Sequence, residues 1–278
     1  MSNDWLSIGD LVARTGIAEP TLRMWERRHG FRQPARTANG HRRYSHEQLE
    51  MVEQVVVARA TGLSLTAAIE RVQHSHPRQN WSPFATLRRR QPDLEPRLIG
   101  KRALVALSHA IEDEMLSRAE RPVIFGCFQR VRFYRQEQAR WLELTQGARA
   151  AAVFADFDAA RAPRNSPAEI PIAAEEPVSR EWSVVCYGER HAVCLSGREP
   201  ASSRADGPTS DRVFETVWTV DADVVRDVAR DCAQAAAEVV PEVGERAADW
   251  LLLRPVSSPR EHTALATAII NRTLSYIS

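Results

Sequence analysis

Four prolines fall within residues 74–97 and limit how this chain can fold: Pro77, Pro83, Pro92 and Pro96. Proline lacks a backbone N–H and its ring clashes with the preceding helical turn, so no single helix can run through this stretch. We therefore expect two domains, residues 1–76 and residues 98–278. A linker over residues 77–97 would separate them, with a short helix that starts at Ser82-Pro83.

The charge of the chain is unevenly distributed. The 278 residues carry a net charge of +1 and are 44% hydrophobic, enough to form a buried core. Residues 21–45 hold seven arginines against one acid, Glu26, which gives them +6 and leaves −5 for the rest. Lys101 is the one lysine, so the abundance of arginine is by itself no sign of function. The local excess of positive charge is the informative feature.

The residues around this basic stretch predict short helices and a hairpin. Ser7 and Asp10 have the spacing of a capping box, and the helix they open should end at Thr15-Gly16. A second helix is expected from Glu19-Pro20, with Leu22 and Trp25 facing inward. Asn39-Gly40 is a strong hairpin signal between basic arms. Two further helices should follow capping residues Ser45 and Ser64.

A helix-turn-helix followed by a basic hairpin is typical of a winged DNA-binding domain. A helix fits the major groove of B-DNA, where its outward side chains reach base edges. Arginines of a hairpin can hold the flanking phosphates, which position the protein without reading sequence. The alternative is that the arginines are only a solvated surface.

The segments TLRMWERRHG, RTANGHRRYS and GLSLTAAI give residues 6–72 a close resemblance to the MerR-type DNA-binding domain. The resemblance implies an all-α winged helix-turn-helix. Together with the outward face of the second helix, it implies these DNA-contacting residues: Thr21, Arg23, Trp25, Arg27, Arg28, Arg36, His41, Arg42, Arg43 and Tyr44. Tyr44 would also brace the wing. Met24 and Ala18 depart from the family, which often has an aromatic residue and a serine cap there.

The resemblance also implies partners. Such proteins usually bind near-palindromic promoter DNA as dimers, and many activate by distorting an overlong promoter spacer. Simple repression is an equal alternative, and RNA polymerase is a further candidate partner. The long dimerisation helix usual after the fourth helix is replaced here by the prolines of residues 74–97. We therefore expect homodimerisation through the second domain.

The second part of the chain alternates between strand and helix patterns, which predicts an α/β domain with a mixed sheet and flanking helices. Apolar runs predict strands over residues 122–128, 149–156, 183–188, 192–196 and 212–220. The third and fourth of these should form a hairpin. Helices are expected over residues 98–119 and 135–146, after Asp221 as far as Pro241, and from Ser258-Pro259.

The segments LSHAIEDEML, GCFQRVRFYR, REWSVVCYG and INRTLSYI give residues 84–277 a resemblance to the DICT sensory domain. It implies reception of a signal, a small molecule or one linked to light. Polar groups in apolar or aromatic surroundings are the candidates for a ligand pocket: His109, Glu112, Arg130, Arg135, Trp182, Trp218, Asn271 and Arg272. Each has a structural alternative. The tryptophans suit a core, residues 112–114 suit a solvated helix face, and Arg272 suits an ion pair.

Other functional classes find little support in the sequence. No metal-binding or cobalamin-type motif is present, and the scattered Cys127, Cys186, Cys194 and Cys232 suggest reduced thiols. There is no catalytic motif, signal peptide or membrane-length apolar run, so we expect a cytoplasmic protein that is not an enzyme. Its cofactor is unknown. The sequence predicts a promoter-binding regulator with a sensory domain. A protein-interaction module is the first alternative for the second domain, and an enzyme-like domain the second.

Overall fold

A computed structural model describes residues 6–29, 35–36, 42–44, 46–75, 81–118, 120–200, 212–252 and 259–277. The chain divides into two compact units, Met1–Asn80 and Trp81–Ser278. The described elements of the first unit are α1 (Ile8–Thr15), α2 (Glu19–His29), β1 (Ala35–Arg36), β2 (Arg42–Arg43), α3 (His46–Ala60) and α4 (Leu65–Ser75). This confirms the helical N-terminal domain that the sequence predicts.

A small apolar core holds the first unit together. Leu11, Trp25, Val55 and Ile69, one from each of α1 to α4, are at most 2% exposed. The predicted hairpin is present as an antiparallel pair in which Arg36 lies opposite Arg42. The Asn39-Gly40 turn between them lies outside the described residues.

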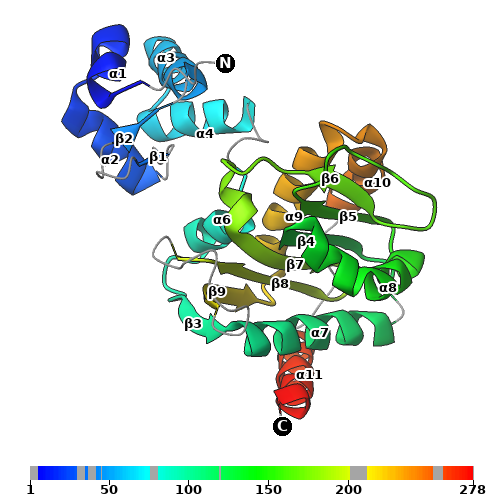
Figure 1. The fold of residues 1–278 in the computed structure, drawn as a ribbon. Helices are drawn as coiled ribbons and strands as arrows, with labels where there is room; N and C mark the ends of the chain where they lie inside the picture. The colour runs from blue at the N-terminus through cyan, green and yellow to red at the C-terminus, as the bar shows by residue number, and fades with distance from the viewer. Residues whose placement is uncertain are drawn as a thin grey trace. The chain divides into compact units, whose positions relative to one another are not determined.

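The second unit is built on one seven-stranded mixed sheet (Figure 1). Its elements are α6 (Pro83–Arg90), β3 (Arg97–Gly100), α7 (Lys101–Ser117), β4 (Val123–Gln129), α8 (Val131–Gly147), β5 (Ala150–Ala155), β6 (Ala168–Pro171), the 3-10 turn η1 (Pro177–Arg180), β7 (Glu181–Tyr187), β8 (Ala192–Arg198), β9 (Val213–Thr219), α9 (Ala222–Ala237), α10 (Pro241–Leu252) and α11 (Pro259–Ile277). The strand order is β3-β9-β8-β7-β4-β5-β6. Only the β4-β5 and β5-β6 pairs are parallel.

Helices cover both faces of this sheet, because its central strands are apolar on both sides. In β4, Phe125 faces a core shared with α6, α9 and α10, whereas Ile124 faces a second core shared with α7, α8 and α11. Every residue of β4 is buried as a result. The domain is thus a helix–sheet–helix sandwich, which confirms the expected mixed sheet with flanking helices.

The boundary between the units differs from the sequence prediction. Residues 81–97 do not form a linker, because Trp81, Phe84 and Leu87 are buried in the core of the second unit. Ser82 caps α6 as expected, and its hydroxyl also donates to the buried carboxylate of Glu181 in β7. Pro83, Pro92 and Pro96 therefore lie at the start of the second unit.

Most elements of the second domain agree with the sequence pattern, including the β7-β8 hairpin. Four elements were not anticipated: the short strands β3 and β6, the 3-10 turn η1 and helix α10. Pro241 does not end α9, which stops at Ala237; it opens α10 instead. The four cysteines are buried and unpaired with one another. None of the helices in the described part of the chain has the length and apolarity to span a membrane.

Gly126→Ala should destabilise the second domain by about 1–3 kcal/mol, the usual cost of overpacking a core. A methyl group at Gly126 would collide with the indole of Trp141, which is fully buried against β4. Gly147→Ala, at the end of α8, is the matched control because a methyl group there meets open space. Urea unfolding measures both variants. Equal stability of the two would contradict this packing.

Candidate functional sites

Helix α1 is fixed at both of its ends by local hydrogen bonds. Asp10 N–H donates to the Ser7 hydroxyl at 3.2 Å, and Ser7 N–H donates to the Asp10 carboxylate at 2.7 Å, which completes the predicted capping box. Gly16 ends α1 in the left-handed conformation, at φ 69°, and its N–H donates to Val12. Such a conformation favours glycine. These contacts define where α1 begins and ends, and residues 16–18 then connect it to α2.

Helix α2 separates an apolar face from a polar one. Leu22 and Trp25 are 3% and 0% exposed, whereas the Arg23 side chain is 52% exposed and forms an ion pair with Glu19 one turn earlier. Thr21 is half-buried. Ala18 stands at the start of the helix without a capping side chain, and its carbonyl accepts from Thr21 and Leu22 N–H groups.

Trp25 is a correction to the expected DNA-contacting set. Its indole is buried in the domain core, so it supports α2 from behind and is not on the outer surface. Tyr44 is also buried and braces the hairpin, with backbone hydrogen bonds of 2.8 Å in both directions to Leu6. His41 and the side chains of the remaining candidates lie outside the described residues: Arg27, Arg28, Arg36, Arg42 and Arg43.

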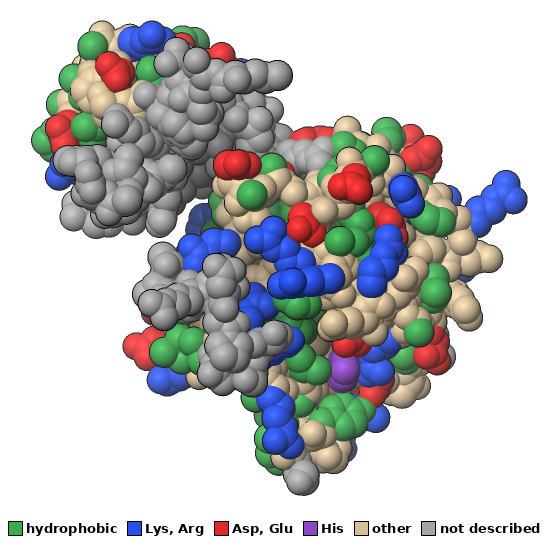
Figure 2. All heavy atoms as spheres, viewed as in Figure 1, with side chains coloured by type: hydrophobic (Ala, Val, Ile, Leu, Met, Phe, Trp, Pro, Cys, Tyr) green, Lys and Arg blue, Asp and Glu red, His purple; other side chains and the backbone are tan. Residues whose placement is uncertain are grey.

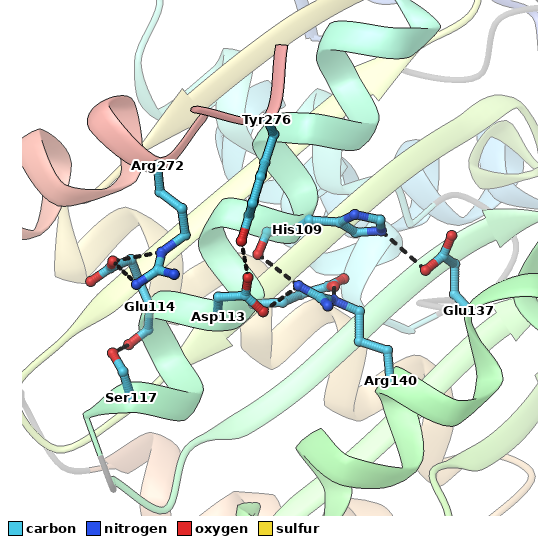
Figure 3. Close-up of polar contacts among 9 residues, drawn as sticks. His109, Asp113, Glu114, Ser117, Glu137, Arg140, Arg272 and Tyr276 are labelled. Carbon is cyan, nitrogen blue, oxygen red and sulfur yellow. Dashed lines mark hydrogen bonds and ion pairs between the residues drawn. The ribbon is translucent and has the colours of Figure 1, made fainter. Parts of the chain in front are cut away.

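In the second domain, a network of charged side chains ties α7 to α8 and α11 (Figure 3). Arg140 of α8 donates from Nε to Glu112 at 2.5 Å and also pairs with Asp113. On the α11 side, Arg272 pairs with Glu114 at 2.8 Å, and the Tyr276 hydroxyl donates to Asp113. The acidic residues 112–114 are therefore inter-helix contacts, which excludes their reading as a solvated face.

The pKa values within this network are shifted from their ordinary values. Burial raises the pKa of Glu112 to about 7, and the nearby charge of Arg140 only partly opposes the shift. His109 Nε2–H donates to Glu137 at 3.0 Å, which raises the pKa of His109 and lowers that of Glu137. Ionisable groups with opposed shifts, held across helices, are typical of functional sites as well as of structural ion-pair networks.

The other predicted ligand residues are not brought into this network. Arg130 pairs with Asp156 at 3.2 Å and Arg135 pairs with Glu169 at 2.5 Å, both near the carboxyl ends of β4 and β5. Trp182 and Trp218 pack against the core of the α7 face; the Trp182 indole N–H donates to Ser108 at 3.0 Å. Asn271 is exposed on α11. Of the eight candidates, His109, Glu112 and Arg272 thus belong to the network, and the other five lie outside it.

Several polar groups beside them were missed. Glu137 and Arg140 supply the α8 side of the network, but they lie in a helical segment where charged residues alternate with aromatic ones, a pattern that an ordinary amphipathic helix also gives. Arg132 and Arg212 share the ring of Phe133 with Lys101. The uniqueness of Lys101 was the one available signal. Within the described residues, no group of three His, Cys, Asp or Glu side chains could hold a metal ion.

A basic helix and a basic hairpin on one small helical core define a winged helix-turn-helix DNA-binding domain. Residues 6–75 match the family described as "MerR HTH family regulatory protein". Residues 82–200 match the DICT family, described as "Sensory domain in DIguanylate Cyclases and Two-component system". The chain therefore combines a first domain that matches the MerR helix-turn-helix family with a second domain that matches the DICT family.

A curated relative supports the first assignment. The chain is similar to the HTH-type transcriptional repressor CarA of Myxococcus xanthus, with 43% identity over 76 residues. These residues are 27% of this chain and 26% of the relative, so the likeness spans about a quarter of that protein. The second domain has its own match, to the DICT family.

Glu112→Gln should flatten the pH dependence of the free energy of unfolding between about pH 5 and 7. The folded chain holds the Glu112 proton up to a pKa of about 7, above the ordinary value of 4.5, so stability falls as the pH rises through this window. The wild-type loss from this group is on the order of 2 kcal/mol. Urea unfolding at a series of pH values measures it.

Glu143→Gln, an exposed position on α8, is the matched control and should leave the profile unchanged. Glu181, whose buried carboxyl also has a pKa raised to about 7, contributes a slope of the same sign that both variants keep. If the free energy of unfolding had the same pH dependence in the wild type and in Glu112→Gln, Glu112 would not have the raised pKa described above.

Proposed function

We propose that the chain is a dimeric, cytoplasmic regulator that binds promoter DNA through its first domain, while the second domain receives a signal and modulates binding. The observation that supports it best is the outward polar face of α2, held on a buried apolar face beside a basic hairpin. Arg23 is exposed on that outer face. In this proposal it reads base edges, and the hairpin arginines contact phosphates.

In the second domain, a change caused by a signal could pass from α7 to α11. The network anchors α11 to α7 through Arg272 and Tyr276, so a ligand that displaces α7 would displace α11 as well. Helix α11 also has an exposed apolar stripe: Ile270, Leu274 and Ile277 are 47%, 53% and 38% exposed. The proposed signal would therefore act on the surface that α11 presents.

We assign this stripe to a second copy of the chain. In residues 263–277 the exposed side chains of α11 are uncharged, and Arg272 is turned toward Glu114. Two copies of a neutral face can pack around a two-fold axis without like-charge repulsion. A dimer also matches the symmetry of near-palindromic DNA sites. The second candidate is a module that binds another protein, for which the same stripe would be the contact.

DNA binding should depend steeply on salt and separate two kinds of arginine. Arg23→Ala is expected to reduce discrimination between the upstream DNA of its own gene and random DNA by about 1–3 kcal/mol, because a base contact is lost. Arg36→Ala should weaken binding to both DNAs alike and lower the salt slope by about 0.9, because a phosphate contact is lost. Fluorescence anisotropy at several salt concentrations measures both.

Arg59→Ala, at the exposed end of α3, is the control and should change neither property. Identical behaviour of Arg23→Ala and Arg36→Ala would refute the division between base reading and phosphate anchoring. The absence of binding to the upstream DNA would refute the DNA-binding proposal itself, and binding that does not depend on salt would refute the phosphate contacts.

Leu274→Glu should convert a dimer into a monomer, because it places a charge in the centre of a buried apolar contact. Leu252→Glu is the matched control, since Leu252 is a leucine on α10 that is 72% exposed and lies outside the stripe. Sedimentation equilibrium measures the association constant, which should fall at least about tenfold in the first variant only. Unchanged dimerisation would show that the stripe is not the dimer interface and would favour the alternative in which it binds another protein.

A further inference from the structure

Two helices of the second domain begin at the same edge of the sheet. Strand β3 runs in the same direction as β8, and β8 in the same direction as β4, because each pair is separated by one antiparallel strand. Helix α7 follows β3 directly and α8 follows β4, so both helices start where these strands end. At the start of α8, Val131 N–H donates to the Asp156 carboxylate at 2.5 Å, so a negative side chain already faces that helix end. At the start of α7, Gly100 has no side chain to cap the helix, and Lys101 N–H donates to the Arg212 carbonyl at 2.9 Å. The positive end of the α7 dipole therefore lies at this edge without a carboxylate bonded to it in the described residues.

Three cations share one aromatic ring at the start of α8. The Phe133 ring lies 5.3 Å from Lys101 Nζ, 4.9 Å from the Arg132 guanidinium and 5.2 Å from the Arg212 guanidinium. Each cation–π contact is favourable, but the like charges repel one another. Figure 2 shows Lys and Arg side chains gathered across the middle of the visible face of this domain.

The repulsion contributes to a lowered pKa of the Lys101 ammonium group. Burial lowers the pKa of its ammonium group first, and the charges of Arg212 and Arg132 lower it further. The charge of Glu137 raises the pKa of Lys101, but the Glu137 carboxylate is already hydrogen-bonded to His109. A bound anion at this place would remove the repulsion.

The three cations differ in their partners. Arg212 is fixed, since it pairs with both carboxylate oxygens of Glu199 at 3.0 Å and donates to Gln129 at 2.6 Å. Gln129 itself is buried and has a φ of 62°, which is rare for a residue other than glycine. In the part of the chain that the structure describes, Lys101 and Arg132 form no ion pair and no side-chain hydrogen bond. Among the described residues, two cations of the cluster thus have no polar partner and lie beside a third that is held rigidly.

We propose that this edge binds an anionic small molecule through a phosphate or carboxylate group, with Lys101 and Arg132 as its direct partners and the start of α7 as a further anion-binding element. This inference, which rests on the sensory function proposed above, supplies the chemical class of the signal. Arg212 orients the site, and Phe133 forms its apolar floor. Helix starts and clustered cations are what proteins use to hold single oxyanions.

The compactness of the cluster favours a small molecule over DNA. All three cations lie around a single ring, and the Arg212 side chain is only 11% exposed, whereas a DNA backbone is normally followed by a longer row of accessible charges. The site also lies at the beginning of α7, whose later turns carry residues 112–114 of the network. An anion that draws Lys101 toward it would therefore act on the helix that anchors α11.

The uniqueness of Lys101 permits a direct test on the full-length protein. Labelling with ¹³C,¹⁵N-lysine gives one side-chain resonance, which is followed by NMR as inorganic phosphate is added at constant ionic strength. Citrate titrated in a second arm distinguishes a carboxylate from a phosphate ligand. We expect a saturable shift with at least one of the two anions, and none with chloride.

Arg132→Gln should weaken that binding by about tenfold, because one charge-assisted partner is lost. Arg121→Gln is the matched control: this exposed arginine precedes β4 at the opposite edge of the sheet and should leave binding unchanged. Thermal unfolding of each variant verifies that it is folded. An equal loss of anion affinity in both variants would mean that binding depends on general surface charge and not on this site.

Two outcomes overturn the anion site: no saturable shift with phosphate or citrate, or a shift with duplex DNA alone. The sensory function is tested separately, by measuring whether the anion that binds changes the DNA affinity of the same sample. Anion binding with unchanged DNA affinity would leave the site standing and contradict the signalling function. Intact DNA binding by a protein that binds neither anion would leave the DNA-binding proposal standing and overturn the anion site.

Discussion

The contact on which the arrangement of the second domain depends is the one between Arg140 and the acidic residues of α7. Arg140 reaches from α8 to Glu112 and Asp113 and also donates to the carbonyl of His109 at 3.0 Å. Glu112 is 3% exposed, so its charge has left water and depends on this arginine for compensation. Removing the arginine would raise the pKa of Glu112 further, because the charge that opposes the effect of burial is lost, and it would break the hydrogen bonds between α8 and α7. The relative positions of α7 and α8 are therefore strongly constrained.

The same acidic residues extend the constraint to the C-terminal helix. Asp113 accepts from Tyr276 and Glu114 pairs with Arg272, so two turns of α11 are attached to α7 by polar contacts above a shared apolar core. Apolar packing alone tolerates sliding, whereas paired groups have a defined register. Helix α7 thus carries both the proposed anion site at its start and the anchors of α11 near its end.

Features set by short-range chemistry were predictable from the sequence. The Ser7–Asp10 capping box, the basic antiparallel hairpin and the apolar strand of β4 each depend on residues close together in the chain. Strand β3 was missed because it is an edge strand with Leu98 70% exposed, which gives no apolar run. The helix of residues 83–90 was predicted, but its domain was not, because that depends on the packing of Phe84 against distant elements.

The candidate sites show the same division. The helical period already placed Trp25 beside Leu22 on the inward face, and the expectation that it contacts DNA came from resemblance alone. Local periodicity was the better guide there. Glu112 was expected to be a solvated or ligand-binding residue, and its burial follows from Arg140, 28 residues further along the chain. Pairings at such separations leave no periodic pattern in the sequence, so a pocket assembled from single residues could not be predicted.

The separation of the chain into two units determines what a signal would have to do. A DNA-binding domain with its own apolar core needs no ligand to fold, so a signal in the second domain would act by changing how two DNA-binding domains are held. A dimer interface is the surface through which such a change is transmitted. Helix α11 combines an inward side tied to α7 with an outward apolar stripe, so a shift of α7 would alter the stripe directly. A ligand could bias DNA binding only to the extent that its affinity differs between the two positions of α7. An anion beside Lys101 meets that condition if its contact with the helix start is made in one of them and lost in the other.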